Sequence, residues 1–165
     1  QLIAAHQPQG LKGLVLVAPS PPVPMHLSDE ERAVLKSAYL CRESVEYVID
    51  HVLTAKKLRS ELREQVIDDS LKGGAEAKKA WPDVAMDEDI SAAVTAIRVP
   101  VKVIAGERDQ VERLSVLNAE LLPRIPQADL HIIPGAGHLL PLEAPAELAT
   151  VIGDFVATVA GAVAR

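Results

Sequence analysis

Three short apolar runs restrict how this chain can fold more than any other feature of the sequence. They lie at residues 14–18, 99–105 and 130–133, and each has the length of one strand. Residues 14–18 form a continuous run, which is typical of strands in parallel sheets that are covered on both faces, whereas Lys102 and His131 interrupt the other two. One helical pattern separates the second run from the third, and another follows the third. We therefore expect an α/β fold with parallel strands joined by right-handed crossovers.

The segment between the first two runs has a different character. Residues 28–79 are charged and helical in pattern, with no strand signal. They open with Ser28-Asp-Glu-Glu31, a capping box whose serine and glutamate bond the free amides at a helix start. A second helix is expected after Ser44, and a third is expected to end at Gly73-Gly74. The sequence thus predicts a helical insertion between the first and second strands.

A carboxylate and a histidine follow the second and third strands. Asp109 ends the turn Gly106-Glu-Arg-Asp109, and His138 lies in the loop Pro134-Gly-Ala-Gly-His138. Neighbouring parallel strands lie ~4.8 Å apart, so loops that leave the same sheet edge can bring two side chains together. An aspartate that accepts the imidazole N–H fixes the tautomer and leaves the other ring nitrogen as a general base. Asp109 and His138 are therefore our candidate catalytic pair, against the alternative of an ordinary turn aspartate and loop histidine.

The chain closes with a helix that starts beside Pro145. Glu143 precedes it and is expected to interact with the positive end of the helix dipole. One face of this helix carries six apolar residues, which we expect to pack on the sheet: Leu148, Val151, Ile152, Phe155, Val156 and Val159.

Other residue types give weaker signals. Cys41 follows an apolar stretch and is expected to be a small buried side chain. His131 and His138 lie on different elements without a third ligand, so no metal site is expected, and the remaining histidines are interpreted as solvated or structural. Four residues of the helical insertion could line an apolar substrate pocket, although core packing is the more common role of such residues: Met25, Tyr39, Trp81 and Met86.

Composition excludes several classes of partner. Apolar residues make up 48% and charged residues 24% of the chain, and the formal net charge is −6. This balance argues against a nucleic-acid groove or a polybasic membrane anchor, and no apolar run approaches the ~18 residues of a membrane span. The single cysteine excludes an internal disulfide framework, which favours a reducing, cytoplasmic compartment.

With these motifs in this order, the chain resembles the C-terminal part of an α/β-hydrolase-fold enzyme. The order of the motifs, acid before histidine, is that of the family, with the histidine loop followed by the start of the final helix. The resemblance implies a mobile helical cap at residues 21–96 and a cofactor-free acid–histidine dyad at Asp109 and His138. Three segments carry it, similar to the sixth strand, the seventh strand with its acid turn, and the histidine loop: residues 11–19, 99–109 and 134–145.

The sequence departs from this family in one respect. The family's nucleophile lies on a Gly-x-Ser-x-Gly elbow, and residues 1–165 contain no such motif. Ser20 has no glycine neighbours and follows the wrong strand, so it is not a substitute. We expect the elbow, the first five strands and the oxyanion-hole loop on a complementary N-terminal segment. Without it, the first strand would leave an unpaired apolar edge that favours aggregation.

The resemblance implies a hydrolase of apolar carboxylic esters or lactones, with no cofactor and a small-molecule substrate. His138 would deprotonate the absent serine, and Asp109 would orient His138. Four alternatives stay open: a dehalogenase- or epoxide-hydrolase-like enzyme with an aspartate nucleophile, a haloperoxidase-like enzyme, a non-catalytic ligand-binding relative and, least favoured because of the exposed strand edge, an autonomous interaction domain.

Overall fold

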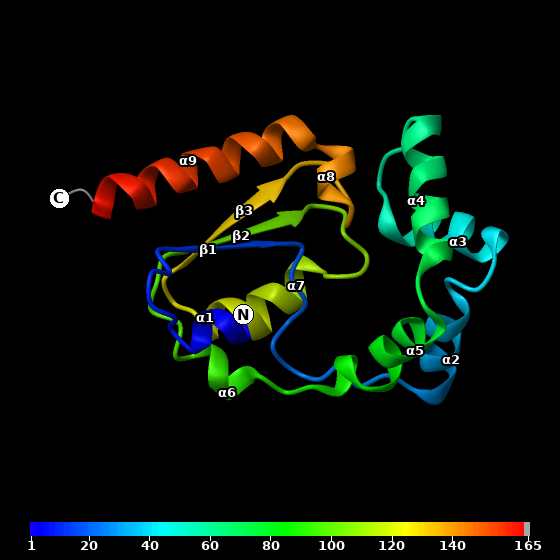
Figure 1. The fold of residues 1–165 in the computed structure, drawn as a ribbon, viewed down its shortest axis with the longest axis horizontal. Coiled ribbons are helices and arrows are strands. Elements are labelled where there is room, and N and C mark those ends of the chain that lie inside the picture. Colours follow the sequence, from blue (N-terminus) through cyan, green and yellow to red (C-terminus); the bar gives the residue numbers. More distant parts are fainter. Residues whose placement is uncertain (164–165) are drawn as a thin grey trace.

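Two groups of elements make up the computed structural model, which describes residues 1–163 (Figure 1). One group is a three-stranded sheet with helices on both faces. The other is a set of helices contributed by the middle of the chain. The α/β class and the three parallel strands predicted from the sequence are confirmed.

The sheet has the order β1-β2-β3, with β1 spanning Leu14–Val17, β2 Val101–Gly106 and β3 Ala128–Ile133. Both pairs of strands are parallel. β2 begins one residue after Pro100, whose carbonyl accepts the Leu14 amide at 2.9 Å. Proline therefore lies where its missing N–H removes no bond from the strand ladder. Because all three strands run the same way, the loops that follow them meet at one edge of the sheet.

Helices cover the sheet on two faces, and the side chains of β2 alternate between them. Val103 and Ala105 pack toward α1 (Leu2–Ala5), α6 (Ser91–Val94) and α7 (Leu114–Val116), which is continued by short helical turns over Leu117–Leu121 and Leu122–Arg124. Ile104 packs on the opposite face with residues of α8 (Leu140–Glu143) and α9 (Pro145–Val163). Period-two alternation in a central strand thus supplies both apolar layers.

The strands differ in burial. In β2 every residue except Lys102 is buried, whereas all four residues of β1 are only half-buried. Within residues 1–163, β1 pairs with β2 alone. Its outer edge is therefore available for a further strand.

The middle of the chain folds into the predicted helical insertion. Its helices are α2 (Asp29–Ser37), α3 (Arg42–Val48), α4 (Ser60–Lys72) and α5 (Ala75–Asp83), with a π-helical turn over Ile49–Leu53 and a short 3-10 turn over Ala85–Asp87. The capping box at Ser28 is present, with Glu31 N–H donating to Ser28 Oγ at 3.2 Å. α5 is a helix that the sequence did not predict. The insertion has an apolar cluster of its own: Val45, Ile49, Leu53, Leu58 and Ile67.

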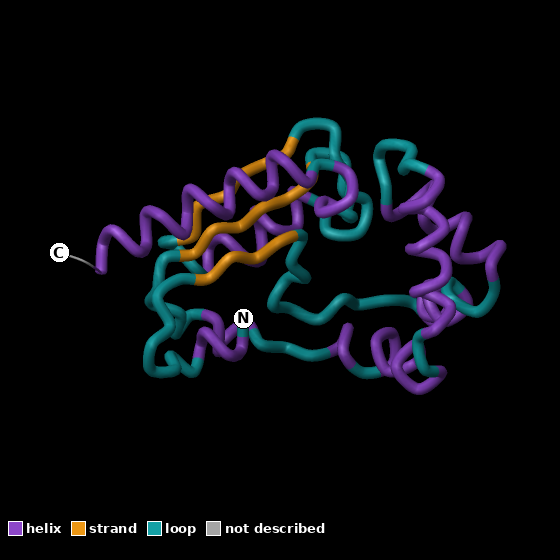
Figure 2. The backbone as a smooth tube through the Cα atoms, turned by 45° about the horizontal axis from the view of Figure 1, so that its top comes forward, coloured by secondary structure: helices purple, strands orange, loops and turns teal. Residues whose placement is uncertain are grey.

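Two connecting segments run side by side between the sheet and the insertion (Figure 2). Met25 N–H donates to the Met86 carbonyl at 2.7 Å, and Ile90 N–H donates to the Pro22 carbonyl at 2.9 Å. The entry and exit of the insertion are thus joined by backbone hydrogen bonds.

Two details differ from expectation. Val156 on α9 is exposed, so the packed face of that helix is narrower than predicted. Cys41 is exposed at the start of α3, where its backbone N–H donates to Ser44 Oγ at 3.3 Å, so the prediction of a buried thiol is wrong. None of the helices within residues 1–163 has both the length and the apolar composition needed to cross a bilayer.

Candidate active site

The loops after β2 and β3 are held together by their backbones. Glu107 N–H donates to the Ile133 carbonyl at 3.0 Å, and Arg108 N–H donates to the Ala136 carbonyl at 2.9 Å. A Cβ at Gly106 would lie 2.2 Å from the Gly137 oxygen, so only glycine permits this approach. The two loops therefore form one packed unit at the sheet edge.

Asp109 lies within this unit with a side chain that is 0% exposed. Its Oδ1 accepts the amides of Val111 at 2.8 Å and Glu112 at 2.9 Å, both from its own loop. Its Oδ2 lies 2.9 Å from Nδ1 of His138. The carboxylate is thus oriented on one side by backbone amides and meets the imidazole on the other.

His138 is partly accessible, with 24% of its side chain exposed. Because Nδ1 faces Asp109, the ring presents Nε2 away from the carboxylate, and Nε2 has no hydrogen-bond partner among the described residues. The hydrogen bond that His138 donates to the Asp109 carboxylate raises the pKa of His138 above its ordinary value, and burial only partly opposes this rise. A histidine held in this way can accept a proton at Nε2 while the aspartate stabilises the resulting charge.

Glu112 is a second buried acid at this site, and it is not among the residues predicted from the sequence. The residue is 4% exposed, and burial raises its pKa to about 7, although the Ser20 side chain and His138 oppose that rise. Ser20 follows β1, so residues after all three strands meet at this edge. The position of Glu112 three residues after Asp109 is the one sequence signal that could have identified it as a residue of this site.

The four predicted pocket residues are spread over the insertion. Met86 is buried, Met25 is half-buried in the paired connections, Tyr39 packs on the apolar cluster of the insertion, and Trp81 is 50% exposed on α5. Their role in substrate binding stays a prediction.

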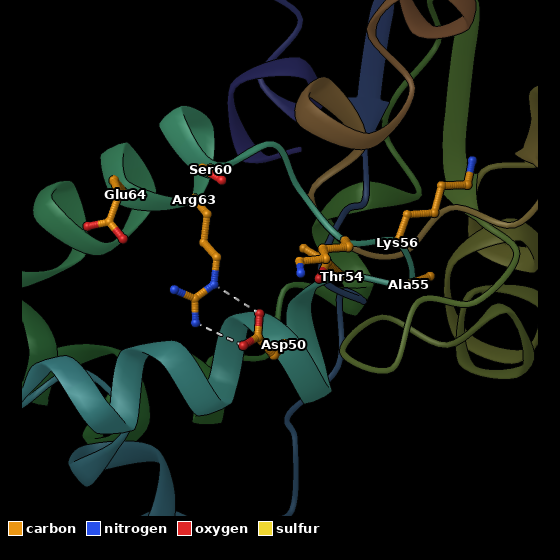
Figure 3. A pocket seen from close by; sticks show the side chains of 8 residues that line it. Asp50, Thr54, Ala55, Lys56, Ser60, Arg63 and Glu64 are labelled. Carbon is orange, nitrogen blue, oxygen red and sulfur yellow. Dashed lines mark hydrogen bonds and ion pairs between the residues drawn. The ribbon is translucent and has the colours of Figure 1, made fainter.

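A polar cavity of about 530 Å³ lies in the insertion between its π-helical turn and α4 (Figure 3). Arg63 of α4 reaches across it, and its Nη2 lies 2.9 Å from Oδ2 of Asp50. Neither Asp109 nor His138 lines this cavity. Its lining residues are Asp50, Thr54, Ala55, Lys56, Lys57, Ser60, Arg63 and Glu64. The described residues contain no group of three or more His, Cys, Asp or Glu side chains suited to binding a metal.

Comparison with known proteins gives a fold. No protein-family model matches the sequence. No curated protein matches it either. Solved structures do match: a bromoperoxidase from Bacillus anthracis (TM-score 0.81, 14% identity, 93% of this chain), an esterase from Exiguobacterium antarcticum (0.76, 18%, 88%) and a membrane phospholipase A described as a bacterial virulence factor (0.74, 22%, 96%).

The chain spans only part of these structures, covering 61% of the bromoperoxidase, 57% of the esterase and 53% of the phospholipase. The three parallel strands, their flanking helices and the partial coverage agree with one another. The chain therefore has a partial α/β-hydrolase fold.

Proposed function

We propose that this chain is the acid- and base-bearing C-terminal part of a hydrolase that acts on carboxylic esters or lactones. The observation that carries the proposal is the hydrogen bond between the buried Asp109 carboxylate and His138 Nδ1, made by loops from neighbouring strands. The esterase and phospholipase similarities support the same class of reaction, and no cofactor is required for it.

In this mechanism His138 Nε2 is the general base. A serine hydroxyl attacks the acyl carbon, and its proton passes to Nε2. The alcohol departs with that proton, leaving an acyl-serine. Water then attacks the acyl carbon and loses a proton to Nε2, which passes that proton to the serine oxygen as the carboxylic acid leaves. Asp109 keeps the imidazole in the required tautomer and stabilises its charged form.

The nucleophile is proposed to come from a complementary N-terminal segment outside residues 1–165. Those residues contain no Gly-x-Ser-x-Gly motif, and the outer edge of β1 is unpaired among the described strands. A strand of that segment would pair with this edge and place the elbow near His138. We call residues 1–165 together with this segment the assembled enzyme. A soluble monomer of residues 1–165 alone that unfolds cooperatively would contradict this part of the proposal.

Residues 21–96 are proposed to be the cap over the substrate, with core parts at residues 1–20 and 97–165. Met25, Tyr39, Trp81 and Met86 are candidates for contact with an apolar acyl or alcohol group. The exposed free thiol of Cys41 is compatible with the proposed cytoplasmic location.

His138→Ala in the assembled enzyme tests the proposal. Hydrolysis of a p-nitrophenyl ester should fall at least ~10³-fold because the general base is lost. The matched control is His51→Ala in the insertion, which should leave the rate unchanged. A fluorophosphonate probe should label one serine in the wild type. Full turnover by His138→Ala would refute the assignment. Labelling of the protein by the probe at a residue other than the elbow serine would also refute it.

The bromoperoxidase similarity favours a second candidate, a haloperoxidase-type reaction at the same dyad. An assay with hydrogen peroxide, bromide and a short carboxylic acid separates it from simple ester hydrolysis. Identification of the elbow residue separates both from enzymes with an aspartate nucleophile, and an inert wild type would favour a ligand-binding relative.

A further inference from the structure

The histidine loop makes its hydrogen bonds to the insertion as well as to the core. The Leu53 carbonyl, at the end of the π-helical turn, accepts the backbone N–H of His138 at 2.9 Å and that of Leu139 at 3.2 Å. The backbone position of the proposed base therefore depends on a residue of the cap, more than 80 positions earlier in the sequence.

Glu143 lies at the centre of this contact. Its Oε1 accepts the amides of Ala55 at 2.7 Å and Lys56 at 3.0 Å, both in the cap. Its Oε2 accepts the Gly137 amide, in the histidine loop, at 3.0 Å. The expectation that Glu143 serves the dipole of the last helix misses these bonds. One carboxylate instead joins two segments through three charge-assisted hydrogen bonds.

Gly137 allows the two segments to approach. A Cβ at this position would lie 2.7 Å from the Ala55 nitrogen and 3.1 Å from the Leu53 oxygen, both backbone atoms. Any side chain would force the segments apart. The close approach is thus built into the backbone and needs a glycine there.

Apolar side chains complete the contact. Leu139 and Leu142, from the histidine loop and α8, pack against the apolar cluster of the insertion, as does Val111 from the acid loop. The insertion consequently meets the core at two places, the paired connections and this contact beside α8, while the rest of it lies away from the sheet (Figures 1 and 2).

We propose that Glu143 is a positioning residue that couples the cap to His138. By holding Ala55, Lys56 and Gly137 through one carboxylate, it makes cap residues 53–56 and the histidine loop move as one unit. A substrate that shifts this part of the cap also shifts the backbone of His138. The role in catalysis rests on the proposed function, whereas the coupling itself is a property of the fold.

The test compares three variants of the assembled enzyme by amide hydrogen exchange and steady-state kinetics. Glu143→Ala removes all three acceptor contacts. Glu143→Gln keeps one oxygen for Ala55 and Lys56 but cannot accept the Gly137 amide with its NH₂ group. The control, Glu147→Gln, changes a half-exposed glutamate of α9 that lies 3.5 Å from His131.

We expect Glu143→Ala to speed exchange at Ala55, Lys56, Gly137 and His138 at least tenfold, with β2 amides unchanged. Glu143→Gln should speed exchange mainly at Gly137, and Glu147→Gln should speed none. The kcat should fall tenfold or more in Glu143→Ala and less in Glu143→Gln, with KM changing less than kcat. The acid limb of the pH profile should move toward lower pH, since a displaced His138 loses its bond to Asp109.

Unchanged exchange at these amides in Glu143→Ala overturns the coupling, as does an equal effect of Glu147→Gln. If Glu143→Ala does not fold, Glu143→Gln decides the question through Gly137 exchange alone. If the wild type has no hydrolytic activity, the proposed function fails, while the exchange data still decide whether Glu143 joins the cap to the loop.

Discussion

The core and the helical insertion proposed as the cap are stabilised by different interactions. The core contains fully buried aliphatic layers on both sides of β2, and its acid and histidine loops are joined by backbone hydrogen bonds. The cap has one small apolar cluster and many surface ion pairs, such as Arg42 with Glu64 and Arg63 with Asp50. Several large apolar side chains of the cap, including Tyr47 and Trp81, are at least half exposed. The proposed catalytic pair thus lies in the region with the larger buried core, and the region proposed to meet substrate has more exposed apolar side chains.

Asp109 in the core and Asp50 in the insertion should respond very differently to the same substitution. Asp109→Asn should lower kcat of the assembled enzyme by about 10⁴-fold, because the amide no longer stabilises the imidazolium or its tautomer. The midpoint of the acid limb of kcat/KM should also fall, since the Asp109 carboxylate raises the pKa of His138. Asp50→Asn in the cap breaks an exposed ion pair and should change kcat less than threefold. Equal effects of both substitutions in ester-hydrolysis assays would contradict the division.

Two isoleucines test whether the regions unfold separately. Ile104 and Ile67 are both fully buried, one in β2 and one in α4. Replacement of either by alanine should cost roughly 2–5 kcal/mol from lost burial and the remaining cavity. Ile104→Ala should lower the stability of the whole molecule, whereas Ile67→Ala should speed hydrogen exchange in the cap and leave β2 protected. A global loss from Ile67→Ala would show that the two regions form one cooperative unit.

The buried carboxyl group of Glu112 should make the stability of the core depend on pH. Its pKa is about 7 in the folded protein and 4.5 as the ordinary value. Below pH 4.5 both the folded and unfolded states hold the proton. Between pH 4.5 and 7 the unfolded state loses it first, so stability falls as pH rises, by up to about 3 kcal/mol.

Urea unfolding at several pH values measures this effect as the difference between wild type and Glu112→Gln. The amide resembles the protonated acid and does not titrate, so the variant should gain relative stability above pH 4.5, reaching its maximum near pH 7. Glu76→Gln, at a side chain that is 94% exposed, is the control and should track the wild type. A constant difference between pH 4 and 8 for Glu112→Gln would exclude a raised pKa.

The smallest effect is expected for the cap ion pairs. Arg63 contacts Asp50 and Glu46, and both carboxylates are partly exposed. Arg63→Gln should cost less than about 1 kcal/mol, and the cost should shrink in 1 M salt because ions screen exposed pairs. Thermal unfolding at low and high salt measures it. A larger loss of stability that does not depend on salt would mean that packing of the aliphatic part of Arg63, rather than its charge, stabilises the insertion around the cavity shown in Figure 3.

Local patterns were sufficient for the features that depend on local order. The strands follow from the apolar runs, the capping box from the Ser28-Asp-Glu-Glu31 motif, and the approach of Asp109 to His138 from the geometry of neighbouring parallel strands. α5 was missed because Gly73-Gly74 ends a helix and Pro82 suggested no other; Pro82 lies in the last turn of α5, so only one residue of the helix follows it.

The missed features of the site depend on distant contacts. Glu143 accepts hydrogen bonds from Ala55 and Lys56, which lie 88 and 87 positions earlier in the chain. The burial of Glu112 depends on how loops after three strands meet. No periodicity in the sequence encodes either contact, so residue type alone suggested a dipole interaction for Glu143 and nothing for Glu112.

The close approach at Gly106 has a consequence for protein engineering. Because a Cβ there would meet the Gly137 and Ala136 oxygens within 2.5 Å, the acid and histidine loops have matched backbone shapes. In chimeras of related hydrolases, a recombination crossover between positions 106 and 137 would join loops from different parents. Crossovers placed in the paired connections near residues 22 and 90 would instead exchange the whole cap and keep both loops from one parent.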